Sequence, residues 1–259
     1  MKITLPDNSF RDLPDGSSGY DLAKDIGPGL AKSAVAITVN GEQKDLHDKI
    51  EGDASVSIIT IDSDDGLDIM RHTLTAQVLA RAIKNLYPKS QLAIGPTIED
   101  GFYYDVETDK TISIDDLQKI EDEMKNIVKT NSSITKKLVS KSDALKVFKS
   151  LKEPYKEEII SESDQKDDFQ LYYQDKEEFV DLCRGPHLPN LSFIGSFKLT
   201  KVSGAYWKGD SKNTMLTRIY GTAWKNDKDL EKYLNTIEEA VKRDHRKLGK
   251  EMDLFHFQD

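Results

Sequence analysis

The segment from residue 62 to residue 88 constrains the fold of this 259-residue chain more than any other segment. Its apolar residues recur at spacings of three and four, which places them along one face of a helix. They are Leu67, Met70, Leu74, Val78, Leu79, Ala82, Ile83 and Leu86. The acidic stretch DSDDGLD (62–68) begins this helix, and Pro88 stops it. The pattern predicts one long helix, which separates a short region before it from a longer region after it.

The region before this helix, residues 1–62, is predicted to be a small α+β module. KITL (2–5), AVAITVN (34–40) and SVSIITI (55–61) are typical of strands. Ser17-Ser18 is expected to cap a short helix over GYDLAKDI, which GPG (27–29) ends. Asn40-Gly41 follows the second strand and indicates a hairpin turn.

The region 63–225 is predicted to be a larger α+β domain with mainly antiparallel sheet. AIGP (93–96) and GFYYDV (101–106) are expected to pair as strands, ITKKLVS (134–140) to form another, and residues 170–224 to form mostly short strands. Helices are expected from Ser113 to about Thr130 and over 142–160, interrupted at Pro154. A charged helix from Asp227 to about Lys250 is expected to act as a linker within a third region, 226–259.

Composition narrows the class of function. The net charge of −9 and the pI near 5.2 disfavour indiscriminate binding to nucleic acid, although they allow a local basic face. VKRDHRKLGK (241–250) is a candidate for such a basic face. The alternative is that it is a solvated helix end. A single cysteine cannot form an internal disulfide, which fits a reducing compartment. We expect no membrane segment and a cytoplasmic location, because no apolar stretch approaches 18 residues.

The stretch FVDLCRGPHLPN (179–190) holds the one cysteine, Cys183, and a histidine four residues later, His187. Such a pair can bind a metal, act as a nucleophile with its base, or position a water or ligand by hydrogen bonds. A buried cysteine beside a structural histidine is the alternative without chemistry. Arg184 favours a functional site, because it stands beside a Gly-Pro turn and suits a phosphate or carboxylate.

Two further segments supply candidate groups. His72 lies early on the long helix, where Ala76 follows at the spacing of four that places two residues on one face. Gln77 lies five residues after His72, about 140° around the helix, so spacing alone does not pair these two residues. Lys156 stands in EPYKEE (153–158), which could present an amine or simply be surface charge.

These motifs together resemble the N-terminal half of bacterial threonyl-tRNA synthetases over essentially the whole chain. ITLPD, DIGPGLAKSAV (25–35) and VNGE (39–42) resemble the family's TGS domain, a ubiquitin-like β-grasp module. GLDIMRH (66–72), AIGPTIEDGFYYDV (93–106), EPYK (153–156), VDLCRGPH (180–187) and KVSGAYWKGDSKNTMLTRIYGTAW (201–224) resemble its editing domain. KRDHRKLGKEMDLFHFQ (242–258) resembles its linker helix and the start of its catalytic domain.

The resemblance implies a proofreading hydrolase that removes serine wrongly attached to threonine tRNA. One methyl group separates threonine from serine, and binding alone discriminates such a pair by only about 10- to 200-fold. By position, the resemblance assigns catalytic roles to His72, Lys156, Cys183 and His187. It assigns substrate contacts to Gln77, Tyr104, Asp181 and Arg184. The implied partners are tRNA(Thr) and seryl-tRNA(Thr), and we expect this chain to be monomeric although the family dimerises through its catalytic domain.

One departure from the family pattern bears on this interpretation. The family's helix carries Arg-His-x-x-x-His, whereas this chain has one extra residue and places Gln77 where the second histidine belongs. Glutamine can exchange hydrogen bonds but cannot act as a base near neutral pH. We therefore predict no metal and no other cofactor in this chain, because a zinc site of the type used by related alanyl editing proteins would lack one good ligand. The family's ATP, Mg²⁺ and Zn²⁺ belong to its catalytic domain.

Three alternatives remain open from the sequence. The chain could be a free-standing trans-editing deacylase, although the linker segment argues against that. It could be a tRNA-binding module whose editing site has decayed. Gln77, in place of a histidine, is the feature that supports this alternative. It could be a TGS-containing regulatory protein, but no G-x-x-x-x-G-K-[S/T] loop is present to bind a nucleotide.

Overall fold

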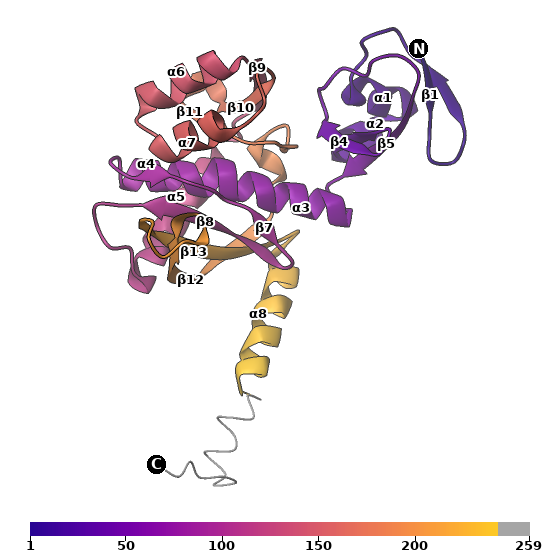
Figure 1. Cartoon of the computed structure of the whole chain (residues 1–259). Helices are drawn as coiled ribbons and strands as arrows, with labels where there is room; N and C mark the ends of the chain where they lie inside the picture. Colours follow the sequence, from indigo (N-terminus) through magenta and orange to yellow (C-terminus); the bar gives the residue numbers. More distant parts are fainter. Residues whose placement is uncertain (243–259) are drawn as a thin grey trace, which may run out of the picture.

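The computed structural model describes residues 1–242 (Figure 1). A small N-terminal unit connects to a larger unit at the start of a long helix, and a further helix, α8 (Asp227–Lys242), extends away from the larger unit. Both units combine helices with mostly antiparallel sheets, which confirms the predicted α+β class. Most of the segment 241–250 and the expected start of a third domain lie outside the described residues. Within residues 1–242, no helix is both long and apolar enough to cross a bilayer.

The N-terminal unit is a five-stranded sheet with two short helices. Its strand order is β2-β1-β5-β3-β4, with β1 and β5 parallel and the other pairs antiparallel. The strands are β1 (Lys2–Thr4), β2 (Phe10–Asp12), β3 (Ala34–Val39), β4 (Glu42–Asp45) and β5 (Ala54–Thr60). The helices are α1 (Gly19–Ile26) and α2 (Pro28–Ser33). The Ser18 side chain accepts a hydrogen bond from the Asp21 backbone N–H and so fixes the start of α1, as the sequence predicts.

The long helix consists of three consecutive parts that share one axis in Figure 1. They are α3 (Asp64–Thr73), a π-helical segment η1 (Leu74–Leu79) and α4 (Ala80–Leu86). The backbone N–H of Ala80 donates to the carbonyl of Thr75, which is the i to i−5 bond of a π turn. A π turn accommodates one extra residue without breaking the helix. The structure thus has a place for the extra residue that the family resemblance implies in this helix.

The larger unit packs this helix against two sheets. One sheet has the order β12-β13-β8-β6, with β7 also paired to β8, and the other has the order β11-β10-β9. The strands are β6 (Gln91–Leu92), β7 (Thr97–Ile98), β8 (Gly101–Glu107), β9 (Ile134–Val139), β10 (Phe169–Gln174), β11 (Phe179–Leu182), β12 (Ser196–Tyr206) and β13 (Met215–Trp224). The remaining helices are η2 (Ile114–Asp116), α5 (Leu117–Lys129), α6 (Lys141–Leu151), α7 (Pro154–Glu162), η3 (Asp175–Glu177), η4 (Leu191–Phe193) and η5 (Trp207–Gly209).

The core of the larger unit forms around the predicted apolar face of the long helix. Met70, Leu74, Val78, Leu79 and Ile83 are buried in one cluster with side chains of both sheets and α5. The same cluster takes in three residues of the N-terminal sheet, Val35, Ala36 and Ile59. The two units therefore share apolar contacts and are not merely tethered by the chain.

Two local expectations differ from the structure. AIGP (93–96) is not a strand but lies between β6 and β7, although Ala93 N–H and the Ile94 carbonyl still bond to Asp105 of β8. Gly95 is needed there, because a Cβ would lie 2.3 Å from the Tyr104 ring. The helix expected over 142–160 is two helices, since Lys152 adopts a left-handed conformation and Pro154 begins the second helix at a position that tolerates proline.

The π turn predicts that one residue can be removed from it with little loss of stability. Deletion of Ala76 should convert the π turn into regular α-helix, and the residues before and after it should keep their orientation toward the core. The unfolding free energy should change by less than about 2 kcal/mol. Deletion of Ala82 from the regular part is the control. It rotates all later residues by about 100° and should cost more than about 3 kcal/mol. Denaturant unfolding of both variants checks this, and equal losses would contradict the prediction.

Candidate functional site

A cavity of about 650 Å³ opens where the long helix, α7 and the end of β11 meet. Five of the residues predicted from the sequence line this cavity: His72, Lys156, Asp181, Cys183 and Arg184. Segments far apart in the chain thus supply one imidazole, one ammonium, one carboxylate, one thiol and one guanidinium group. Ile94, Gly95, Pro96, Ile159 and Phe169 give the cavity an apolar wall, and Gln165, Asp168 and Gln170 lie around it as well.

Two histidines and the cysteine are in mutual contact. His72 Nε2 lies 2.7 Å from Cys183 Sγ, and its ring stacks on that of His187 with centroids 4.7 Å apart and planes 9° apart. His187 itself does not line the cavity but lies behind His72, buried against the N-terminal unit. The CxxxH spacing therefore places Cys183 at the cavity and His187 as support for the other imidazole.

A threonine fixes the orientation of the His187 ring. The Thr73 hydroxyl accepts a hydrogen bond from the Leu188 backbone N–H at 2.9 Å and lies 3.1 Å from His187 Nδ1. The hydroxyl can serve Leu188 and Nδ1 at once, because it has one proton and two lone pairs. His187 Nε2 is buried and has no hydrogen-bond partner among the described residues.

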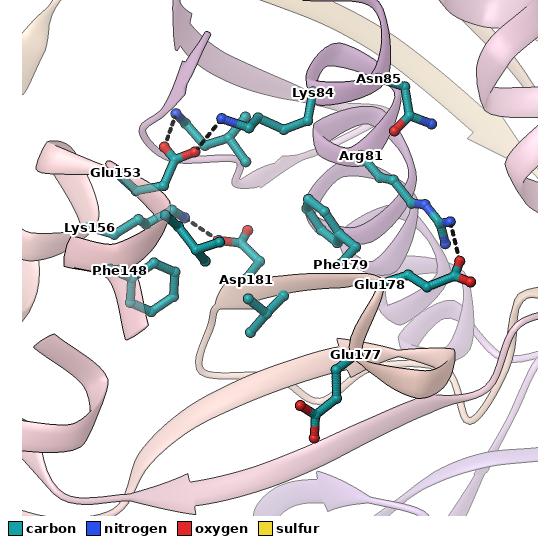
Figure 2. Close-up of a pocket in the computed structure, with 13 residues that line it drawn as sticks. Arg81, Lys84, Asn85, Phe148, Glu153, Lys156, Glu177, Glu178, Phe179 and Asp181 are labelled. Carbon is teal, nitrogen blue, oxygen red and sulfur yellow. Dashed lines mark hydrogen bonds and ion pairs between the residues drawn. The ribbon is translucent and has the colours of Figure 1, made fainter. Parts of the chain in front are cut away.

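Lys156 and Asp181 form a buried ion pair that lines the cavity and also a second, neighbouring pocket, which Figure 2 shows. Lys156 Nζ lies 2.6 Å from Asp181 Oδ1, and both side chains are at most 4% exposed. Asp181 also accepts from the Leu182 N–H at 2.8 Å and from the Tyr104 hydroxyl at 3.2 Å. Tyr104 is thus placed behind Asp181 and out of the cavity, so its predicted contact with substrate becomes a contact with the carboxylate.

Burial sets the charge of these groups. It lowers the pKa of His72 to about 4, with a smaller contribution from the Lys156 ammonium, and it holds the pKa of His187 well below its usual range. It raises the pKa of Cys183 to about 12. Burial also raises the pKa of Asp181, against the opposing effect of Lys156. Near neutral pH the cavity therefore contains neutral imidazoles and a protonated thiol, so a resting thiolate nucleophile is disfavoured.

Gln77 is, after His187 and Tyr104, the third predicted site residue that does not line the cavity. Its side chain is fully buried, and the Gln174 side-chain amide donates to both its backbone carbonyl and its Oε1. Ala76 lines the cavity instead. This agrees with the spacing in the sequence, which places Ala76 and not Gln77 on the face of the helix that carries His72.

Sequence reasoning missed three residues that support the site. Thr73 orients His187, Tyr172 packs edge-on against the His187 ring with centroids 4.3 Å apart, and Asp45 binds both His187 and Tyr172. Thr73 directly follows the candidate His72, which was the one available signal. Asp45 and Tyr172 carry no local signal, because their contacts depend on how distant segments pack.

The three convergent donors fit a metal ion poorly. Donor atoms of His72, Cys183 and His187 lie within 4.8 Å of one another. A zinc ion, however, lies about 2.0–2.1 Å from each nitrogen, along the lone pair in the plane of the ring. Rings that are stacked with planes 9° apart cannot both direct a lone pair in-plane at one ion between them. We derive no step through a metal at this site.

This geometry predicts that the purified chain binds no stoichiometric zinc. Metal analysis after dialysis against zinc, and then against buffer, should find less than about 0.1 zinc per chain, because a site with a misdirected ligand binds weakly. A Cys183→Ala variant treated in parallel reports adventitious binding elsewhere. One zinc per wild-type chain that is lost in C183A would contradict the prediction.

Two segments of the chain match known domain families. Residues 1–60 match the TGS domain, and residues 170–220 match the threonyl and alanyl tRNA synthetase second additional domain. The second interval includes Asp181, Cys183, Arg184 and His187. The chain is also 49% identical over 257 residues to a threonine--tRNA ligase of Prochlorococcus marinus (strain MIT 9211). That alignment covers 99% of this chain and 40% of the relative, so the chain spans about two fifths of the relative's length.

Proposed function

We propose that this chain, which is related to threonine--tRNA ligases and carries a TGS domain and a second additional domain, hydrolyses seryl-tRNA(Thr). The observation that carries the proposal is the cavity itself. It combines a neutral imidazole, a thiol and a buried lysine–carboxylate pair. Ester hydrolysis needs a positioned water, a base and a positive group near the developing oxyanion.

His72 is the proposed base of this reaction. Because burial keeps its imidazole unprotonated at neutral pH, it can accept a proton from water as the water oxygen attacks the ester carbonyl. The tRNA terminal ribose oxygen then leaves with a proton, and the products are serine and tRNA with a free hydroxyl. His187, stacked behind His72, limits the orientations that the His72 ring can take.

Lys156 and Asp181 are proposed to handle the charges of the substrate. The Lys156 ammonium is directed to the cavity by Asp181 and can stabilise the oxyanion or supply a proton to the leaving oxygen. Asp181 can bind the amino group of serine. Cys183, a hydrogen-bond partner of His72, can contact the serine hydroxyl, and exposed Arg184 at the cavity edge can bind a phosphate of the tRNA strand.

A second candidate function is tRNA binding without hydrolysis. The observation that favours it is the absence of a second imidazole on the helix side of the cavity, where Ala76 stands. Loss of one polar group from a hydrolytic site commonly costs about 100- to 1,000-fold in rate. The threonine attachment for which the relative is named is not assigned to any of the residues described here.

Deacylation of seryl-tRNA(Thr) by the purified chain tests the proposal, with threonyl-tRNA(Thr) as the control substrate. Serine should be released at least about 10-fold faster than threonine. His72→Ala should lower the serine rate by about 100-fold or more, and Cys183→Ala should also lower it, without a change in fold. His47→Ala is a matched control, because His47 is an exposed histidine outside the cavity. No release above buffer while tRNA remains bound would favour the binding module.

The pH dependence of the rate follows from the lowered pKa of His72. The imidazole is the active form, and it becomes protonated only as the pH falls through about 4. The rate relative to the uncatalysed ester should therefore persist from pH 8 to about pH 5 and fall below that. Single-turnover measurements between pH 4 and 8 check this. A midpoint near the ordinary histidine value of about 6.5 would mean that His72 is not the base in this environment.

A further inference from the structure

We propose that Asp45, a residue of the N-terminal unit, is a positioning residue for the imidazole pair of the cavity. The inference rests on the proposed hydrolysis but concerns a different part of the chain. Asp45 is the last residue of β4, and it is 142 residues from His187 in sequence. It does not line the cavity, so any effect on the reaction must pass through the residues that it holds.

The Asp45 carboxylate uses both of its oxygens on the larger unit. Oδ1 accepts from the His187 backbone N–H at 2.8 Å. Oδ2 accepts from the Tyr172 hydroxyl at 2.8 Å and lies 2.9 Å from Lys136 Nζ. The carboxylate thus fixes the backbone that carries the His187 ring and also the phenol that packs against the edge of that ring.

These contacts lie where the protein has little freedom to compensate. His187 and Tyr172 are 2% and 1% exposed, and the pocket beside them is lined by Asp45 itself. A donor that loses its acceptor in such a place destabilises the arrangement that held it. Tyr172 retains a second acceptor in Gln170 Oε1 at 3.0 Å, but the described contacts give the His187 N–H only Asp45. Loss of the carboxylate should therefore release the His187 backbone first.

Displacement of His187 would reach the cavity through ring contacts. Its imidazole stacks on His72, and His72 in turn contacts Cys183 at 2.7 Å. A shift of a catalytic group by about 1 Å can reduce a rate by about 100-fold. Since Asp45 lies outside the cavity, we expect a change in kcat and little change in KM.

A neighbouring aspartate provides a matched control. Asp48 lies in the same turn, and its carboxylate accepts from the Asp45 backbone N–H at 3.1 Å. It also pairs with Lys136 at 2.5 Å, so it shares one of the ion-pair partners of Asp45. Among the described contacts, however, Asp48 touches neither His187 nor Tyr172. The two residues separate the effect of positioning from that of charge at the junction between the units.

The experiment compares Asp45→Ala, Asp45→Asn and Asp48→Ala in the complete chain, using kcat and KM for seryl-tRNA(Thr) and thermal unfolding. D45A should lower kcat by about 10-fold or more with KM within about twofold. D45N should recover part of the loss, because its amide oxygen can still accept from the His187 N–H. D48A should stay within about twofold of wild type in kcat. Equal kcat in D45A and D48A would overturn the proposal while leaving the hydrolysis intact.

A second readout keeps the test independent of the proposed hydrolysis. Histidine-selective ¹³C labelling reports the environment of the His187 ring by NMR in the folded variants. D45A should shift the His187 ring signal and D48A should not. If the wild-type chain hydrolyses no seryl-tRNA, the proposed function fails, and this signal alone decides the placement of His187. An unchanged His187 signal in D45A would overturn the positioning role in either case.

Discussion

The packing of the helix from Asp64 to Leu86 against the two sheets is the constraint on which the rest of the structure depends. One face of this helix supplies much of the apolar core of the larger unit, and the same helix carries His72 and Thr73. Burial of several large apolar side chains holds its axis and rotation in place, at about 25 cal/mol per Å² of apolar surface removed from water. His72 is therefore directed by the core and not by the loops around it.

The π turn reconciles that packing with an extra residue. A one-residue insertion in a regular α-helix would rotate everything after it by about 100° and remove either the core face or the site face. The wider turn between Leu74 and Leu79 confines the change to a few positions. The core residues after the turn keep their places, and the cost is local: Ala76 faces the cavity, and Gln77 is buried with a side-chain amide nitrogen that has no partner among the described residues.

Low exposure then determines the chemistry of the cavity. The same burial that makes His72 and His187 neutral also makes the Cys183 thiol a poor source of thiolate. The one strongly charged pair at the cavity, Lys156 with Asp181, is held by short contacts and by Tyr104. Such an environment favours proton transfer to a neutral base and stabilisation of charge that develops during a reaction. The N-terminal unit also helps to position these groups, because its Asp45 accepts a hydrogen bond from the His187 backbone N–H.

The sequence by itself determined the α+β class, the helix that begins near residue 63, the short strands and the set of residues that gather at the cavity. The class, the helix and the strands follow from periodicity and turn residues, which are local properties. The full set of site residues follows from the resemblance to a known family. It could not determine that AIGP (93–96) runs between two short strands, that the Gln174 amide bonds to Gln77, or that Asp45 binds His187. Those outcomes were decided by tertiary structure, because each depends on which of several acceptable hydrogen-bond or packing partners lies nearest once the chain has folded. Asp45 and His187, for example, are 142 residues apart in the sequence.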